Sequence, residues 1–137
     1  MDILLDRGNF ILIYYHDDRK SASKTEHILR ERFEICPEIA WAVKEMVKNI
    51  YDHSDTKEGF LSLNISNSKN FSLKVWDTSK KPVDLNKKWI KKNDFNFGVG
   101  VGMIKDLKKN SESWNLYISL ETHTFHGVFY NLIVENC

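Results

Sequence analysis

The chain has 137 residues, of which 42% are hydrophobic and 12% aromatic, and its 20 basic and 19 acidic side chains leave a net charge of +1. This length fits one compact domain, residues 1–137, with a real hydrophobic core. The balanced charge argues against a general nucleic-acid binder or a binder of acidic membranes, because both carry a strong basic excess. We therefore expect neither a nucleic-acid partner nor a membrane partner.

Three further features bear on the compartment. No apolar run approaches the roughly 18 residues that a membrane-spanning helix needs. The first residues include Asp2 and Asp6, where a signal peptide needs basic residues. The two cysteines, Cys36 and Cys137, lack the spacing of a metal site, and one is the last residue, so we expect no disulfide scaffold. These features predict a soluble, cytoplasmic protein in reducing surroundings.

The first half of the chain predicts one strand and two helices. Residues 9–15 form an apolar run rich in β-branched and aromatic side chains, which is typical of a strand. Residues 16–23 are polar and indicate a loop, and residues 24–34 carry apolar positions at helical spacing. Pro37 suits the first turn of a second helix over about 37–53. One apolar stripe of that helix is expected to be buried, and it consists of Ile39, Val43, Met46 and Ile50.

The second half predicts mostly strands. The expected elements are strands over 61–65 and 71–77 joined by a turn at 67–70, short helices near 84–91 and 103–107, and strands over 114–120 and 128–134. Between the two central strands and the two final strands lies a polar and basic stretch, residues 78–97. This order of elements predicts an α+β fold, a two-layer α/β sandwich in which helices cover one face of a mostly antiparallel sheet.

Glu45 and Asn49 form the first candidate site pair. They lie four residues apart on the predicted helix and therefore share a face. That face lies about 100° round the helix from the apolar stripe, at the edge between core and solvent. A carboxylate there can deprotonate a water molecule, and an amide oxygen can bind Mg²⁺. The alternative is an ordinary solvated helix face.

Asp77 is the second candidate. It ends the strand over 71–77, and alternation points its side chain to the face that carries Phe71, Leu73 and Val75. A carboxylate on that face needs a partner, and the exocyclic amine of adenine is a suitable donor. The alternative is an aspartate that caps the turn after the strand.

Three glycines at alternate positions, Gly98, Gly100 and Gly102, form the third candidate. They directly precede a predicted helix. Glycine allows close backbone approach, and the free N–H groups at the start of a helix attract anions, so the run fits phosphate binding. The alternative is a flexible loop that enters a helix.

Taken in order, these motifs resemble the GHKL ATPase domain, which histidine kinases, anti-sigma-factor kinases, Hsp90-like and MutL-like proteins share. The resemblance covers roughly residues 36–135. It rests on a helical Glu-x-x-x-Asn, two strands that end in Asp, a polar loop, Gly-x-Gly-x-Gly before a helix, and two final strands. It implies a Bergerat-type fold, with a mixed, mostly antiparallel sheet, that binds ATP and Mg²⁺.

The resemblance also implies roles for individual residues. Glu45 would be the general base, Asn49 the Mg²⁺ ligand, and Asp77 the acceptor for the adenine amino group. Asp52 and His53 would line the same site. The phosphates would be held by Gly98, Gly100 and Gly102. The implied function is an ATP-binding regulatory domain that acts on a partner protein, as histidine-kinase and anti-sigma-factor serine kinase domains do, with room for a homodimer.

Two other interpretations stay open. The second family motif is usually Asp-x-Gly-x-Gly, but Asp77 is followed by Thr78, Ser79, Lys80 and Lys81, so both glycines are missing. A non-catalytic protein-interaction module that keeps the fold and has lost the nucleotide would explain this. An unrelated α+β domain with a chance order of motifs is the third interpretation. An open cavity beside Asp77 would favour the nucleotide, and a filled one the interaction module.

Overall fold

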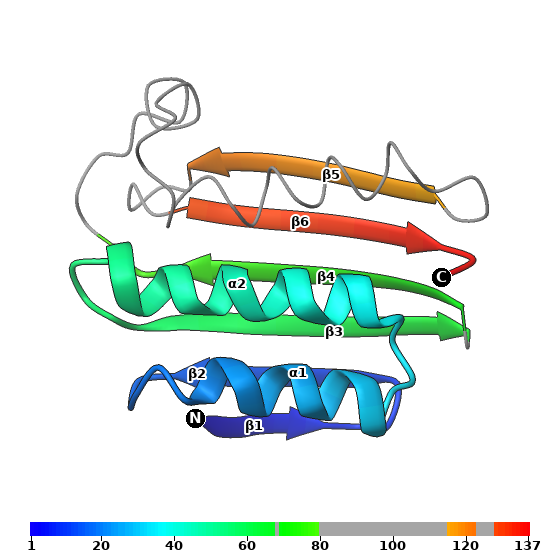
Figure 1. Cartoon of the computed structure of the whole chain (residues 1–137), viewed down its shortest axis with the longest axis horizontal. Coiled ribbons are helices and arrows are strands. Elements are labelled where there is room, and N and C mark those ends of the chain that lie inside the picture. Colours follow the sequence, from blue (N-terminus) through cyan, green and yellow to red (C-terminus); the bar gives the residue numbers. More distant parts are fainter. Residues whose placement is uncertain (68, 80–114, 123–127) are drawn as a thin grey trace.

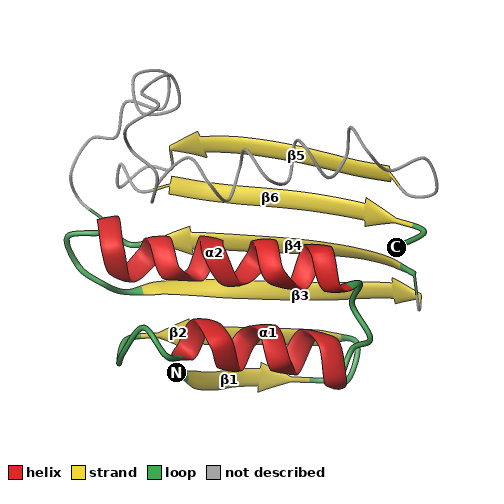
Figure 2. Cartoon of the chain, in the orientation of Figure 1, coloured by secondary structure: helices red, strands yellow, loops and turns green. Residues whose placement is uncertain are grey.

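The computed structural model describes residues 1–67, 69–79, 115–122 and 128–137. Within these ranges the chain forms one six-stranded sheet with two helices packed on one face, which confirms the predicted α+β class (Figure 2). The helices predicted near 84–91 and 103–107 lie outside the described residues, and so do Gly98, Gly100 and Gly102. No helix in the described ranges is long and apolar enough to cross a membrane.

The sheet has the strand order β1-β2-β3-β4-β6-β5. Its elements along the chain are β1 (Asp2–Asp6), β2 (Phe10–Tyr15), α1 (Ser21–Glu31), α2 (Pro37–His53), β3 (Gly59–Asn67), β4 (Asn70–Asp77), β5 (Asn115–Thr122) and β6 (Val128–Glu135). Figure 1 shows α1 over β1 and β2, and α2 over β3 and β4. The two helices run in opposite directions, so the start of α1 lies beside the end of α2.

Every strand pairing in the described sheet is antiparallel, so the mixed sheet implied by the resemblance is not seen there. Strands that follow one another along the chain pair with each other, as β1 with β2, β3 with β4 and β5 with β6. Antiparallel neighbours of this kind need only short turns. The predicted turn at 67–70 is confirmed, because Asn67 ends β3 and pairs with Asn70 at the start of β4.

Helix α2 confirms the prediction for its range and its buried stripe. Pro37 occupies the first turn, where its missing N–H costs nothing. The stripe residues are at most 2% exposed, and they are Ile39, Val43, Met46 and Ile50. The end of the helix packs very closely on the sheet. A Cβ atom at Gly59 would lie 2.5 Å from the carbonyl oxygen of Trp76 and 2.6 Å from Cδ1 of Ile50.

Two predictions for the N-terminal part need correction. Strand β1 was not predicted, because all five of its residues are exposed and no alternation marks it as a strand. Helix α1 begins at Ser21, inside the predicted loop over 16–23, and ends at Glu31 rather than at residue 34. The polar sequence concealed this start, since Ser21 and Thr25 are buried and hydrogen-bonded.

The structure also contains a disulfide, although the cysteine spacing led us to expect no disulfide scaffold. Cys36 and Cys137 are joined, with Cα atoms 5.7 Å apart and a sequence separation of 101. Cys36 is the N-cap of α2, and the N–H of Cys137 donates to the carbonyl of Lys69 beside the start of β4. The sheet therefore brings both cysteines to one end of the molecule. The cysteines therefore give no support for reducing surroundings, and the cytoplasmic location stays a prediction.

The sheet face opposite the helices carries a row of four aromatic rings, one from each of four neighbouring strands. Tyr14 stacks on Phe60, Phe60 on Trp76 and Trp76 on Phe129, with centroid separations of 5.1, 5.4 and 5.7 Å. Each stacked pair is also a directly opposed pair in the strand register. Cross-strand aromatic pairs stabilise a sheet, so this row fixes the register of the strands that carry the candidate site.

Candidate functional site

Asn49 and Tyr130 make a buried polar contact between the last turns of α2 and strand β6. Nδ2 of Asn49 donates to the Tyr130 hydroxyl at 3.1 Å, and the residues are 7% and 3% exposed. Burial is the main cause that raises the pKa of the Tyr130 phenol, while the Asn49 hydrogen bond acts in the opposite direction. The phenol is therefore neutral and can serve as an acceptor across the physiological range.

Asp77 lies next to this pair. It is 8% exposed at the end of β4, on the helix-covered face, as alternation predicted. Its negative charge also raises the pKa of Tyr130. Tyr130 lies opposite Val75 in the register of β4 and β6, so Asp77, two residues further along β4 on the same face, is its diagonal neighbour. One carboxylate oxygen accepts the Ser79 backbone N–H at 2.9 Å. We call Asn49, Asp77 and Tyr130 the Asn49 site.

The Asn49 site contains two residues that the sequence motifs indicated and one that they missed. Tyr130 is separated from Asn49 by 81 positions, and it sits in a run that reads as an ordinary apolar strand. Nothing local marks its hydroxyl. The only available signal is that a polar phenol on a buried strand face needs a hydrogen-bond partner.

Glu45 lies one turn before Asn49 on α2. Its side chain is 17% exposed, and Oε1 lies 3.3 Å from Nζ of Lys48. This ion pair orients the carboxylate along the helix surface. The structure therefore places Glu45 at the predicted edge between core and solvent, with its charge already paired.

The other predicted residues occupy different surroundings. Oδ2 of Asp52 lies 3.1 Å from the guanidinium of Arg19, just before α1, so its carboxylate is engaged on the α1 side of α2. His53 is the half-buried last residue of α2. Among the described residues, Asn49 and Asp77 are both neighbours of Tyr130, whereas Asp52 pairs with Arg19.

The donors present fit a magnesium ion that arrives with a nucleotide. No group of three His, Cys, Asp or Glu side chains in the described ranges is placed to hold a metal. Because Nδ2 of Asn49 donates to Tyr130, Oδ1 is the amide atom available to a cation. Mg²⁺ keeps several waters and takes phosphate oxygens as ligands, so Oδ1 of Asn49 would be one ligand among these.

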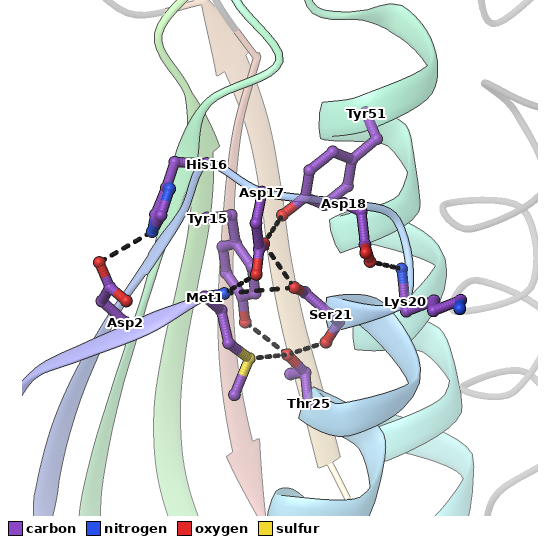
Figure 3. Close-up of polar contacts among 10 residues, drawn as sticks. All are labelled: Met1, Asp2, Tyr15, His16, Asp17, Asp18, Lys20, Ser21, Thr25 and Tyr51. Atoms are coloured by element: carbon purple, nitrogen blue, oxygen red, sulfur yellow. Dashed lines mark hydrogen bonds and ion pairs between the residues drawn. The ribbon is translucent and has the colours of Figure 1, made fainter.

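A second polar cluster lies at the start of α1 and was not predicted (Figure 3). The Asp17 carboxylate accepts hydrogen bonds from the N-terminal ammonium of Met1, from Ser21 Oγ at 2.7 Å and from the Tyr51 hydroxyl at 3.2 Å. The ammonium is the main cause that holds the pKa of Asp17 well below its usual range. Tyr15 and Thr25 share a buried hydrogen bond of 2.6 Å beside it. This cluster joins the edge of the sheet to both helices.

Comparison of the sequence with protein-family models gave no match, and comparison with curated proteins gave none. The candidate function therefore rests on the residues and their arrangement.

Proposed function

We propose that the chain is an ATP-binding regulatory domain of the GHKL type, with a Bergerat-type fold in which the Asn49 site receives Mg-ATP. The observation that carries the proposal is that Asn49 and Asp77 both neighbour Tyr130. Asn49 donates to the phenol from α2, and Asp77, at the end of β4, is the diagonal neighbour of Tyr130 on the same sheet face. An amide and a carboxylate from separate motifs are thereby combined in one buried polar site.

Each group has a chemical task in this proposal. The Asp77 carboxylate accepts the exocyclic amine of adenine, and Oδ1 of Asn49 contributes to the coordination of Mg²⁺. Bound Mg²⁺ would offset the phosphate charge. The Tyr130 hydroxyl orients the Asn49 amide, and the Glu45 carboxylate, one turn earlier, is placed to accept a proton from a water or a protein hydroxyl. Gly98, Gly100 and Gly102 are proposed to contact the phosphates.

A specific contact favours the second candidate, a non-catalytic interaction module of the same fold. Ser79 replaces a glycine of the family motif, is 4% exposed, and donates its N–H to Asp77. The chain itself therefore occupies one acceptor position of the carboxylate. A nucleotide must use the other acceptor positions of Asp77 or displace the Ser79 turn.

Calorimetric titration with Mg-ATP and Mg-ADP decides between the two. We expect saturable binding to the unmodified chain, and at least tenfold weaker binding to Asp77→Asn, because the amide puts a donor where adenine offers one. Asp2→Asn is the matched control, since Asp2 is exposed on β1 and pairs with His16. Its affinity should not change.

A melting-temperature shift measured with the same ligands gives an independent check, because a ligand that binds only the folded state stabilises it. Absence of binding at millimolar nucleotide would reject the nucleotide proposal and leave the interaction module. Under either proposal the domain acts on a protein partner in the cytoplasm, and light scattering tests whether two copies pair.

A further inference from the structure

A basic cavity of about 350 Å³ opens between α1 and α2. Its lining consists of Arg19, Lys20, Ala22, Ser23, Lys44 and Lys48. Four of these six side chains are cationic and none is acidic. Four cationic side chains thus surround one cavity in a chain whose net charge is only +1.

Three of the four cationic side chains form ion pairs with carboxylates that do not line the cavity. Asp52 pairs with Arg19 at 3.1 Å, Glu45 with Lys48 at 3.3 Å and Glu26 with Lys44 at 4.0 Å. These contacts restrict the cationic side chains without placing an acid in the cavity. Lys20 forms no ion pair within the described ranges, and Figure 3 shows its ammonium pointing away from the Asp17 cluster.

The first turn of α1 adds to the positive field. Ala22 and Ser23 belong to this turn and line the cavity. The turn contains no acidic residue, and the N-cap, Lys20, makes no capping hydrogen bond through its side chain. The partial positive charge of the helix start therefore acts together with the four side-chain cations.

The cavity is separate from the Asn49 site. Lys48 and Asn49 are consecutive helical residues and point about 100° apart. Asn49 contacts Tyr130 on β6, whereas Lys44 pairs with Glu26 of α1. The two sites thus use different flanks of α2, and the Glu45–Lys48 ion pair connects them.

We propose that this cavity binds a phosphate group carried by a small phosphomonoester. A compact dianion can accept charge-assisted hydrogen bonds from the Arg19 fork, the three lysines and the Ser23 hydroxyl at once. The volume matches the lower range of small-molecule pockets, so it also holds a small organic group beside the phosphate. Inorganic phosphate and phosphomonoesters share this chemistry, and the experiment separates them.

The test is an NMR titration of the full chain, following backbone amides, with inorganic phosphate and with O-phosphoserine at constant ionic strength. We expect saturable shifts at residues 19–23 and 44–48. Lys20→Gln and Lys44→Gln should each weaken binding by about fivefold, the upper range for one exposed charge. Lys24→Gln is the matched control, because Lys24 is an exposed lysine of α1 outside the cavity lining. It should leave the affinity unchanged.

Tighter binding of phosphoserine than of phosphate supports the proposal, because it shows that the organic group is also held. Equal affinities would overturn the phosphomonoester and leave a free-anion site. Shifts that do not saturate, or an equal loss in Lys24→Gln, would mean charge screening alone and overturn the site. Since Lys20 is exposed, its variant should fold. Phosphate titration of Asp77→Asn keeps this outcome distinct from that of the nucleotide proposal, because that variant should bind phosphate normally.

Discussion

Removal of the Tyr130 hydroxyl is expected to destabilise the fold through the Asn49 side chain. Tyr130→Phe keeps the ring in place but removes the acceptor that lies 3.1 Å from Asn49 Nδ2. Both residues are buried, at 3% and 7% exposure, so water does not easily replace the lost partner. A buried donor left without a partner costs about 1–3 kcal/mol, and we expect a loss of unfolding free energy in that range.

The paired variant makes this prediction sharper. Asn49→Leu removes the donor and leaves the phenol unpartnered, so it should also destabilise the fold. The double variant removes both groups, and apolar replacement of both partners is close to neutral. The sum of the two single losses of unfolding free energy should therefore exceed the loss in the double variant by about 1 kcal/mol.

Urea unfolding followed by circular dichroism measures all three variants, and constant m-values check that the unfolded ensemble is unchanged. Tyr117→Phe on β5 is the control, because this tyrosine is 55% exposed and its variant should stay within about 0.5 kcal/mol of the original stability. Strictly additive losses in the double variant would refute the Asn49–Tyr130 interaction, and with it the orientation assigned to the Asn49 amide.

Three further predictions concern the rest of the fold. Burial raises the pKa of Tyr51 to about 12 and raises that of Tyr130 from the ordinary 10.0, so unfolding releases protons above pH 10. Stability should be unaffected by these groups below pH 10 and should fall as the pH rises above 10 toward the folded-state values. Thermal melts from pH 8 to 11 follow the start of this fall, and a flat profile contradicts it. Gly59→Ala should cost about 1–3 kcal/mol in urea unfolding, because its Cβ would overlap the Trp76 carbonyl oxygen, and an unchanged midpoint would disprove that packing. Reduction of the Cys36–Cys137 bond should lower stability by roughly 2–5 kcal/mol, as expected for a closed loop of this length, and the Cys36→Ser variant should show the same loss and no response to reductant.

The sequence predicted those features whose cause is local. Helix α2 was placed at both ends because a proline fixes its start and one apolar stripe runs along it. The inward direction of Asp77 followed from strand alternation alone. Contacts between segments that are distant in the sequence leave no local pattern from which they could be predicted. The partners of Asn49 and of Cys36 lie 81 and 101 positions away, and only the strand order brings them close.

The start of α1 shows a different limit. Its polar residues read as a loop, because solvent is the usual partner of Ser and Thr. In the structure Ser21 and Thr25 are buried, and their hydroxyls bond to Asp17 and to the Ser21 carbonyl. A polar residue is compatible with the core when its neighbours supply its hydrogen bonds. The period of the apolar residues does not report such polar partners, and one of them, the Tyr15 hydroxyl bonded to Thr25, lies on β2.

The position of α2 gives the two proposed sites a common test. Asn49 lies next to Ile50. The side chain of Ile50 is one of the groups that the Cβ atom of an alanine at Gly59 would overlap. Lys44 lies almost two turns earlier on the helix, further from that contact. A Gly59→Ala chain that still folds should therefore displace the end of α2 and weaken nucleotide binding more than phosphate binding. If both affinities fall together, the helix moves as one body and the two flanks of α2 are coupled. If neither falls, the strain is absorbed in the strands, and the close contact at Gly59 does not position the Asn49 site.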